Sequence, residues 1–373
     1  MKKKKTLNII LISIFIFFLY IPSVTYIFLK NKITTENLEN RTLAPRPSFS
    51  IDTITSFPKQ FEDYYNDHLP YRNNIVINWR NLHYKIFDES LDDKVLIGKN
   101  ENNEPWLFYD NIKKDDEISF IDGRKTVTQE EMDTNLRRIK EETQKLKDKK
   151  IDLYYIICPN KSTIYSQYLP KIVNISEDYF IKIYNYLKDN GVNNLYYSVD
   201  LLKEASKIHE TYYRTDTHWN SYGAFLYVKD ILNGIYGKEI LKETSIEESF
   251  FDSNDRDLHK FMGISIKIKE NKLNVSYENK KSLTPKRVET NNGYAEVFEN
   301  KDYLINETVL LVGDSFTTAS SPYFISLYKK VIRVQFNWTK YDKELVEMFN
   351  PDKIFYIRVE RSLPESLNFE FID

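Results

Sequence analysis

From about residue 128 onward, short apolar runs alternate with longer amphipathic segments, and this alternation constrains the fold more than any other feature. Each apolar run has the length and continuous hydrophobicity of a buried parallel strand: 151–159, 193–199, 308–316, 331–337 and 353–360. Strands that alternate with helices predict a mostly parallel sheet covered on both faces. We therefore expect an α/β fold, a three-layer α/β/α domain spanning residues 128–373.

Residues 238–300 interrupt this alternation. They are polar, and stretches such as ISIKIKENKLNVSYE alternate polar and apolar residues with the period of an exposed strand. We expect a small β insertion here, in the form of a hairpin or small sheet.

The segment before the predicted sheet is organised differently. Residues 57–127 predict two amphipathic helices broken around Pro70, and then a hairpin whose turn is GKNENNE. Residues 31–56 are polar, contain two prolines and are typical of a linker.

The N-terminal residues predict on which side of the cell membrane the rest of the chain lies. Four lysines at positions 2–5 precede an uncharged run from residue 6 to residue 29. At about 1.5 Å per residue, a helix of this length crosses the roughly 30 Å hydrocarbon core of a bilayer. We expect residues 1–30 to form a cytoplasmic tip and a single transmembrane anchor, with the catalytic domain outside the cell. The alternative is a cleaved signal peptide, although no A-x-A-like site follows the run.

Composition excludes several classes of protein. The chain has 53 basic and 55 acidic residues, a net charge of −2, which predicts no nucleic-acid partner. The single cysteine, Cys158, excludes an intrachain disulfide and a cysteine zinc site. The remaining histidines have no tight ligand spacing to His218, so we expect no metal. We also expect no cofactor.

One candidate for chemistry is Ser315, which follows an apolar strand in the sequence Gly-Asp-Ser. Ligands bind at the carboxyl edge of a parallel sheet, and a serine there lies near backbone N–H groups that can stabilise an oxyanion. The alternative is an ordinary turn or helix cap.

A second candidate is the segment Asp216-Thr217-His218-Trp219. A serine nucleophile needs a neutral imidazole to accept its proton, and a carboxylate fixes the required tautomer. Asp216 and His218 can form that pair, with Trp219 walling the site. The alternative is a surface loop whose histidine caps the helix that begins near Asn220.

Together, these two motifs resemble the DHHW and alginate O-acetyltransferase (AlgJ/AlgX-type) branch of the SGNH hydrolase-like superfamily. That branch pairs an Asp-x-His-Trp loop with a later Gly-Asp-Ser-Phe strand end. The segments FEDYYNDHLPYRNNI, PNKSTIY and DLHKFMG are also similar to it. The order is permuted relative to ordinary SGNH hydrolases, because the Asp–His pair comes before the serine.

The resemblance implies that Ser315 is the nucleophile, His218 the general base and Asp216 its orienting carboxylate. Ser315 would carry an acyl group, expected to be acetyl, and pass it to a polysaccharide outside the cell. A multi-span membrane-bound O-acyltransferase would be the partner that delivers the acyl group. Candidates for the oxyanion hole or substrate site, by position alone, are Asn160, Lys161, Trp219 and Arg358, with Glu360 beside Arg358; a structural ion pair is the alternative for these last two.

Two other functions remain open. One is an esterase of the same fold that transfers the acyl group to water. The other is a non-catalytic module that binds a cell-wall polymer.

Overall fold

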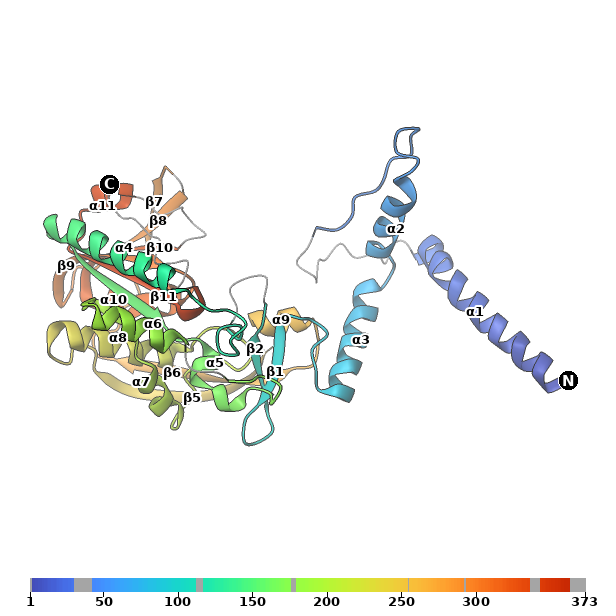
Figure 1. Cartoon of the computed structure of the whole chain (residues 1–373), viewed down its shortest axis with the longest axis horizontal. Coiled ribbons are helices and arrows are strands. Elements are labelled where there is room, and N and C mark those ends of the chain that lie inside the picture. Colours follow the sequence, from blue (N-terminus) through green and yellow to red (C-terminus); the bar gives the residue numbers. More distant parts are fainter. Residues whose placement is uncertain are drawn as a thin grey trace. The chain divides into compact units, whose positions relative to one another are not determined.

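The structure is a computed structural model that describes residues 2–29, 42–111, 117–175, 179–253, 255–291, 293–335 and 343–362. The chain divides into two compact units (Figure 1). One unit comprises Met1–Asp92 with Lys260–Ile266. The other comprises Asp93–His259 with Lys267–Asp373.

The first unit is helical. Helices α2 (Phe57–Asp67) and α3 (Arg72–Phe87) form on either side of Pro70, as predicted. Proline lacks an N–H group and disfavours helical geometry in the residue before it, which explains the break. The Arg80 guanidinium of α3 donates to the backbone oxygens of Phe261 and Met262, tying the distant segment 260–266 to this unit.

The N-terminal apolar run forms helix α1 (Lys2–Leu29). Within the residues that the structure describes, however, none of the helices combines the length and the hydrophobicity needed to cross a membrane. The structure therefore gives no support to the predicted transmembrane anchor.

The second unit is built on a seven-stranded sheet in the order β4-β3-β11-β9-β10-β8-β7. Its first five strands are parallel, as predicted: β4 (Leu195–Tyr196), β3 (Asp152–Cys158), β11 (Lys353–Val359), β9 (Ile305–Gly313) and β10 (Tyr328–Gln335). Strand β9 lies between β11 and β10, and its last five residues, Val309–Gly313, are all buried. The mixed α/β fold with a central sheet is thus confirmed.

Helices cover both faces of this sheet. Helix α10 (Phe316–Leu327) connects β9 to β10, and α11 (Lys343–Phe349) connects β10 back to β11 on the other side of β9. The general right-handedness of such crossovers predicts that the two helices lie on opposite faces, and Figure 1 shows α8 and α10 on one side with α4 and α11 on the other. The remaining helices of the unit are α4 (Gln129–Asp148), α5 (Lys161–Ile164), α6 (Tyr179–Asp189), α7 (Val199–Ser206) and α8 (Ser221–Tyr236), with 3₁₀ turns at Ser166–Tyr168 and Glu360–Ser362. Helix α9 (Asp257–Met262) begins in this unit, and its residues from Lys260 onward belong to the first. A capping box between Thr128 and Glu131 begins α4. Helix α7 was not expected, because its two turns directly follow the short strand β4.

The predicted β insertion divides into two parts. Strands β5 (Glu243–Ser253) and β6 (Ile268–Tyr277) form a separate antiparallel pair, as expected of a hairpin or small sheet. Strands β7 (Lys286–Thr290) and β8 (Gly293–Glu299) instead extend the central sheet, because β8 pairs antiparallel with β10. An alternating pattern shows that one face of a strand is buried and does not reveal which sheet the strand joins.

The predicted hairpin β1 (Val95–Lys99) and β2 (Pro105–Tyr109) also belongs to the second unit. The Asn100 side-chain oxygen accepts from the N–H groups of Asn102 and Glu104, which closes the turn.

Candidate active site

Ser315 lies where the central strand β9 passes into helix α10. It is the N-cap residue of α10, yet its hydroxyl makes no capping hydrogen bond and is free for another partner. The preceding Asp314 fixes the turn, because its two carboxylate oxygens accept from the N–H groups of Phe316 (3.0 Å) and Val359 (2.7 Å). Ser315 is therefore held at the carboxyl edge of the parallel strands, beside the positive end of a helix dipole.

Gly313 allows this turn to pack tightly against the neighbouring strand. A Cβ atom at position 313 would lie 2.1 Å from the Ile357 backbone oxygen and 2.3 Å from Thr317 Oγ1. Only glycine fits such a close approach of two backbones.

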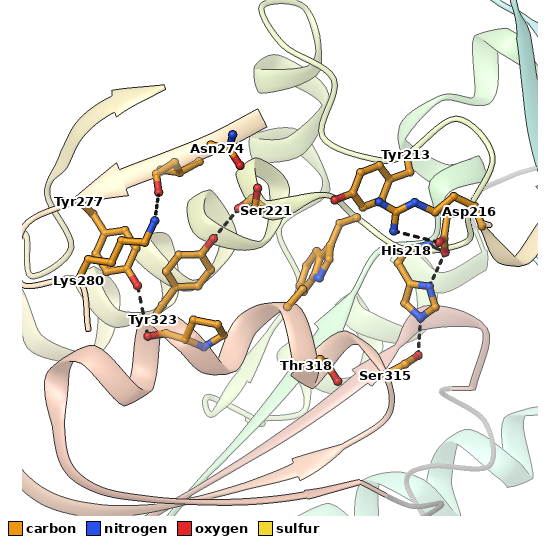
Figure 2. Close-up of a pocket in the computed structure, with 15 residues that line it drawn as sticks. Tyr213, Asp216, His218, Ser221, Asn274, Tyr277, Lys280, Ser315, Thr318 and Tyr323 are labelled. Carbon is orange, nitrogen blue, oxygen red and sulfur yellow. Dashed lines mark hydrogen bonds and ion pairs between the residues drawn. The ribbon is translucent and has the colours of Figure 1, made fainter. Parts of the chain in front are cut away.

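His218 and Asp216 extend from the serine as a chain of hydrogen bonds. His218 Nε2 lies 2.5 Å from Ser315 Oγ, and His218 Nδ1 lies 2.6 Å from Asp216 Oδ1 (Figure 2). With the Nδ1 proton directed at the carboxylate, Nε2 is left to accept the serine proton. The helix after this loop is capped by Asn220, whose Oδ1 accepts from Gly223 N–H at 3.0 Å, so His218 is not the cap.

Charged side chains hold the loop that carries His218 from two directions. The Lys161 ammonium is fully buried and donates to the backbone oxygens of Tyr213 (3.3 Å), Arg214 (3.3 Å) and Asp216 (2.5 Å). The Glu270 carboxylate accepts from the N–H groups of Arg214 (2.9 Å) and Thr215 (2.6 Å). Together with the Leu107 N–H, which donates to the Arg214 oxygen at 2.9 Å, these contacts satisfy the polar backbone groups of a loop that lies outside the helices and strands.

The electrostatics favour an ionised Asp216 and a basic His218. Burial would raise the pKa of the Asp216 carboxyl, but hydrogen bonds and charge from His218, together with Arg256, hold that pKa well below its ordinary value. Burial would lower the pKa of His218, but the hydrogen bond and charge of Asp216, and then the charge of Asp257, raise it above its ordinary value. Both shifts favour an imidazole that takes a proton readily.

A pocket of about 570 Å³ opens beside Ser315 and His218. Residues three and four positions apart, on one face of α10, form part of the pocket lining, and strand β6 contributes another part (Figure 2). The lining also includes Trp219, Tyr213, Tyr277, Arg256 and Lys280. This volume is in the range of pockets that enclose a drug-sized molecule, and is far larger than an acetyl group requires.

The other sequence-predicted residues divide into two groups. Trp219 lines the pocket and packs edge-to-face on Phe316, with ring centroids 5.0 Å apart. Asn160, Lys161 and Arg358 are not among the residues that line the pocket.

Each of these three residues makes structural contacts. The Asn160 N–H donates to Glu360 Oε2 at 2.8 Å, and its side-chain oxygen accepts from Arg361 at 3.1 Å. Lys161 holds the His218 loop, as described above. The Arg358 Nε atom lies 4.0 Å from Asp314 Oδ2, so it is near the turn that presents Ser315.

Sequence reasoning missed Arg256 and Asp257, which lie 40 residues beyond the Asp216–His218 loop. Arg256 lies 3.6 Å from Asp216 Oδ2 and stacks over Tyr213, 3.7 Å from the ring centroid. Asp257 Oδ2 lies 3.7 Å from His218 Nδ1. The one sequence feature that pointed to this region was the segment DLHKFMG, which begins at Asp257 and is similar to the family.

Asp216, His218 and Asp257 also have a spacing that could suit a metal ion, with ligand atoms within 4.8 Å of one another. Their facing atoms are already engaged: His218 Nδ1 with Asp216, and both Asp257 oxygens with Thr217. We therefore describe the group as a hydrogen-bonded network.

Comparison with known families identifies the domain. The profile of the SGNH hydrolase-like domain of the acetyltransferase AlgX matches residues 95–328. Among curated proteins, none matches this sequence.

Two solved structures are similar in fold, and a third is a weaker match. Bacillus cereus PatB1 with a sulfonyl adduct has a TM-score of 0.55 and 17% identity, over 74% of this chain and 98% of its own. A DHHW family protein from Eubacterium siraeum has a TM-score of 0.51 and 12% identity, over 77% of this chain and 98% of its own. The O-acetyltransferase domain of Pseudomonas putida AlgJ has a TM-score of 0.48 and 16% identity, over 72% of this chain and 92% of its own.

The profile match spans more than half of the chain and includes both the Asp216–His218 loop and Ser315. The family resemblance predicted from the sequence is confirmed, and the chain belongs to the SGNH hydrolase-like family of the acetyltransferase AlgX.

Proposed function

We propose that this protein is an O-acyltransferase that carries an acyl group, acetyl in the first instance, on Ser315 and transfers it to a polysaccharide hydroxyl. The observation that carries the proposal is the hydrogen-bonded chain from Ser315 Oγ through His218 to Asp216, at the edge of a large pocket. Membership of a family that includes an acetyltransferase supports an acyl-transfer reaction.

In this scheme His218 Nε2 takes the hydroxyl proton of Ser315 while the serine oxygen bonds to the acyl carbonyl carbon. The bond to the donor's leaving oxygen breaks, and His218 returns the proton to that oxygen. An acceptor hydroxyl then gives its proton to His218 and attacks the acyl carbon, and Ser315 regains its hydroxyl. Asp216 stays ionised throughout and stabilises the imidazolium.

The pocket supports a sugar as the acceptor. Its walls include Trp219 and three tyrosines, of which Tyr213 alone is partly exposed, and an aromatic ring provides a flat apolar face that suits the apolar face of a sugar ring. The volume of about 570 Å³ leaves room for an acceptor beside an acylated serine.

The proposed cellular setting rests on the sequence. The lysines and apolar run of residues 2–29 favour a protein whose catalytic part lies outside the cell. Acetyl-CoA does not occur there, so we propose a multi-span membrane acyltransferase as the partner that supplies the acyl group.

The test is to trap the intermediate. The full-length protein is incubated with p-nitrophenyl acetate, and peptide mass mapping measures acetylation at Ser315. We expect the adduct in the wild type, its loss in Ser315→Ala and its strong reduction in His218→Ala. Ser221→Ala is the matched control, since Ser221 lines the same pocket but its hydroxyl donates to the Leu273 backbone oxygen.

Added oligosaccharides separate the reactions. Discharge of the adduct onto a sugar hydroxyl supports the transferase, and discharge onto water alone in the presence of all acceptors supports the esterase. Unchanged acetylation in Ser315→Ala would refute the assignment of the nucleophile.

A further inference from the structure

Asp257 is the second carboxylate beside His218. It begins helix α9 (Asp257–Met262), and both of its oxygens face the loop that carries the histidine. Oδ1 accepts from Thr217 N–H at 2.9 Å, and Oδ2 accepts from Thr217 Oγ–H at 2.5 Å. Oδ2 also lies 3.7 Å from His218 Nδ1, so one carboxylate contacts two consecutive residues of the loop.

This arrangement carries an electrostatic cost. Burial, and then the charge of Asp216, raise the pKa of Asp257, because two carboxylates lie close together in a partly buried place. A contact whose purpose was only to order the loop could be made by a neutral side chain without that repulsion. A cation between the two carboxylates removes the repulsion, and a protonated His218 is such a cation.

We propose that Asp257 is a positioning residue for His218: through Thr217 it fixes the loop so that Nδ1 faces carboxylate oxygen and Nε2 faces Ser315, and its charge stabilises the imidazolium that forms during acyl transfer. The inference rests on the proposed function for its catalytic meaning. It adds a residue that the Asp–His–Ser chain does not contain.

The adjacent Arg256 completes the arrangement. Its guanidinium lies 3.6 Å from Asp216 Oδ2, the oxygen that does not contact His218 Nδ1. The dipeptide Arg256-Asp257 thus contacts both members of the Asp216–His218 pair. Arg256 offsets the negative charge of Asp216, and Asp257 adds negative charge beside His218.

The charged groups around His218 determine in which direction its pKa moves when the charge of Asp257 is removed. Asp216 and Asp257 favour its protonated form, while Arg361, from the turn after β11, and burial oppose it. Arg256 acts indirectly, through its pairing with Asp216. Removing the charge of Asp257 therefore lowers the pKa of His218, and the proton-accepting form appears at a lower pH.

The experiment measures the His218 titration directly, by NMR of full-length protein labelled in its histidine side chains. His218→Ala identifies the signal among the five histidines. We expect the His218 midpoint to move to lower pH in Asp257→Asn, whose amide oxygen still accepts from Thr217 N–H. The matched control is Asp255→Asn, which removes the same charge from an exposed position two residues away, and its midpoint should equal that of the wild type.

Turnover of p-nitrophenyl acetate against pH gives the second measurement. In Asp257→Asn the acidic limb should shift in the same direction, with a several-fold lower maximal rate and little change in KM. Thr217→Val keeps the charge of Asp257 and removes the hydroxyl, which donates to Asp257 Oδ2 and lies 3.3 Å from His218 Nδ1. It should lower the rate while moving the acidic limb much less than Asp257→Asn does.

An unchanged His218 midpoint in Asp257→Asn would overturn the proposal, whether or not the protein turns over ester. If Asp257→Asn does not fold, Asp257→Ser gives the same comparison, since a serine hydroxyl accepts from Thr217 without a charge. Failure of the proposed function would look different: Ser315 would never be acylated, while the His218 midpoint would still shift in Asp257→Asn.

Discussion

The close packing at Gly313 makes a prediction whose size follows from the structure. In Gly313→Ala the new methyl group would lie 2.1 Å from the Ile357 oxygen of β11 and 2.3 Å from Thr317 Oγ1. Because the first of these atoms belongs to the backbone of a central strand, no side-chain rotation can relieve the clash. Strands β9 and β11 must separate locally.

Two terms contribute to the cost. Overpacking a well-packed site costs about 1–3 kcal/mol. Separation of the strands also weakens the bond from Asp314 N–H to Ile357 O, now 3.3 Å, and a lost hydrogen bond costs about 1 kcal/mol. We expect Gly313→Ala to lower the free energy of unfolding by about 2–4 kcal/mol, which at about 2 °C per kcal/mol for a unit of this size is a fall in Tm of roughly 4–8 °C. Displacement of Ser315 should also reduce ester turnover on the order of 100-fold.

Thermal and urea unfolding of the full-length protein measure the effect, with Gly234→Ala as the control. Gly234 lies within helix α8, and the nearest atom to an added Cβ is on the Tyr196 ring at 3.6 Å. Alanine is the better helix former, so this variant should be about 0.5–1 kcal/mol more stable than the wild type. If Gly313→Ala proved as stable as Gly234→Ala, the reasoning about backbone approach at the serine turn would be refuted.

Three further predictions concern other parts of the second unit. Thr128→Ala removes the capping box of α4 and should cost about 1 kcal/mol in urea unfolding, whereas an unchanged midpoint would contradict its role. Lys161→Met removes a donor from three backbone oxygens of the His218 loop, of which only the Arg214 oxygen keeps the Leu107 N–H, and should cost about 3 kcal/mol; a variant of wild-type stability would show that the loop does not need the ammonium. Since the pKa of His218 is raised and the base must be neutral, ester turnover should increase with pH through a midpoint above the ordinary histidine value of about 6.5; a midpoint at or below that value would exclude the carboxylates as its cause.

The alternation of strands and helices was readable from the sequence because buried parallel strands are continuous apolar runs. The strands β3, β9, β10 and β11 all lie within or close to the predicted runs. The position of β7 and β8 was not readable, since an alternating strand shows a buried face without naming its partner. Helix α7 was missed because two turns provide too little periodicity to detect.

The residues of the site also differ in how far the sequence predicted them. Ser315, His218 and Asp216 were predicted because local motifs and the family resemblance both point to them. Lys161 was selected by its position after a strand, but the structure turns its buried ammonium toward backbone oxygens. Glu270 and Asp257 reach the loop from residues 40 to 56 positions away, and only the folded chain brings such carboxylates together.

The place of β11 in the sheet has a consequence for the order of folding. This strand is the last of the chain's described strands, yet it lies between β3, the first strand of the sheet, and β9, which leads to Ser315. During synthesis, β3 and β9 must wait with open edges until residues 353–359 arrive, and a sheet closed by such distant segments forms slowly. The serine turn acquires its Val359 contact only at that final step, so a chain that stops before β11 should accumulate as an aggregation-prone, inactive species.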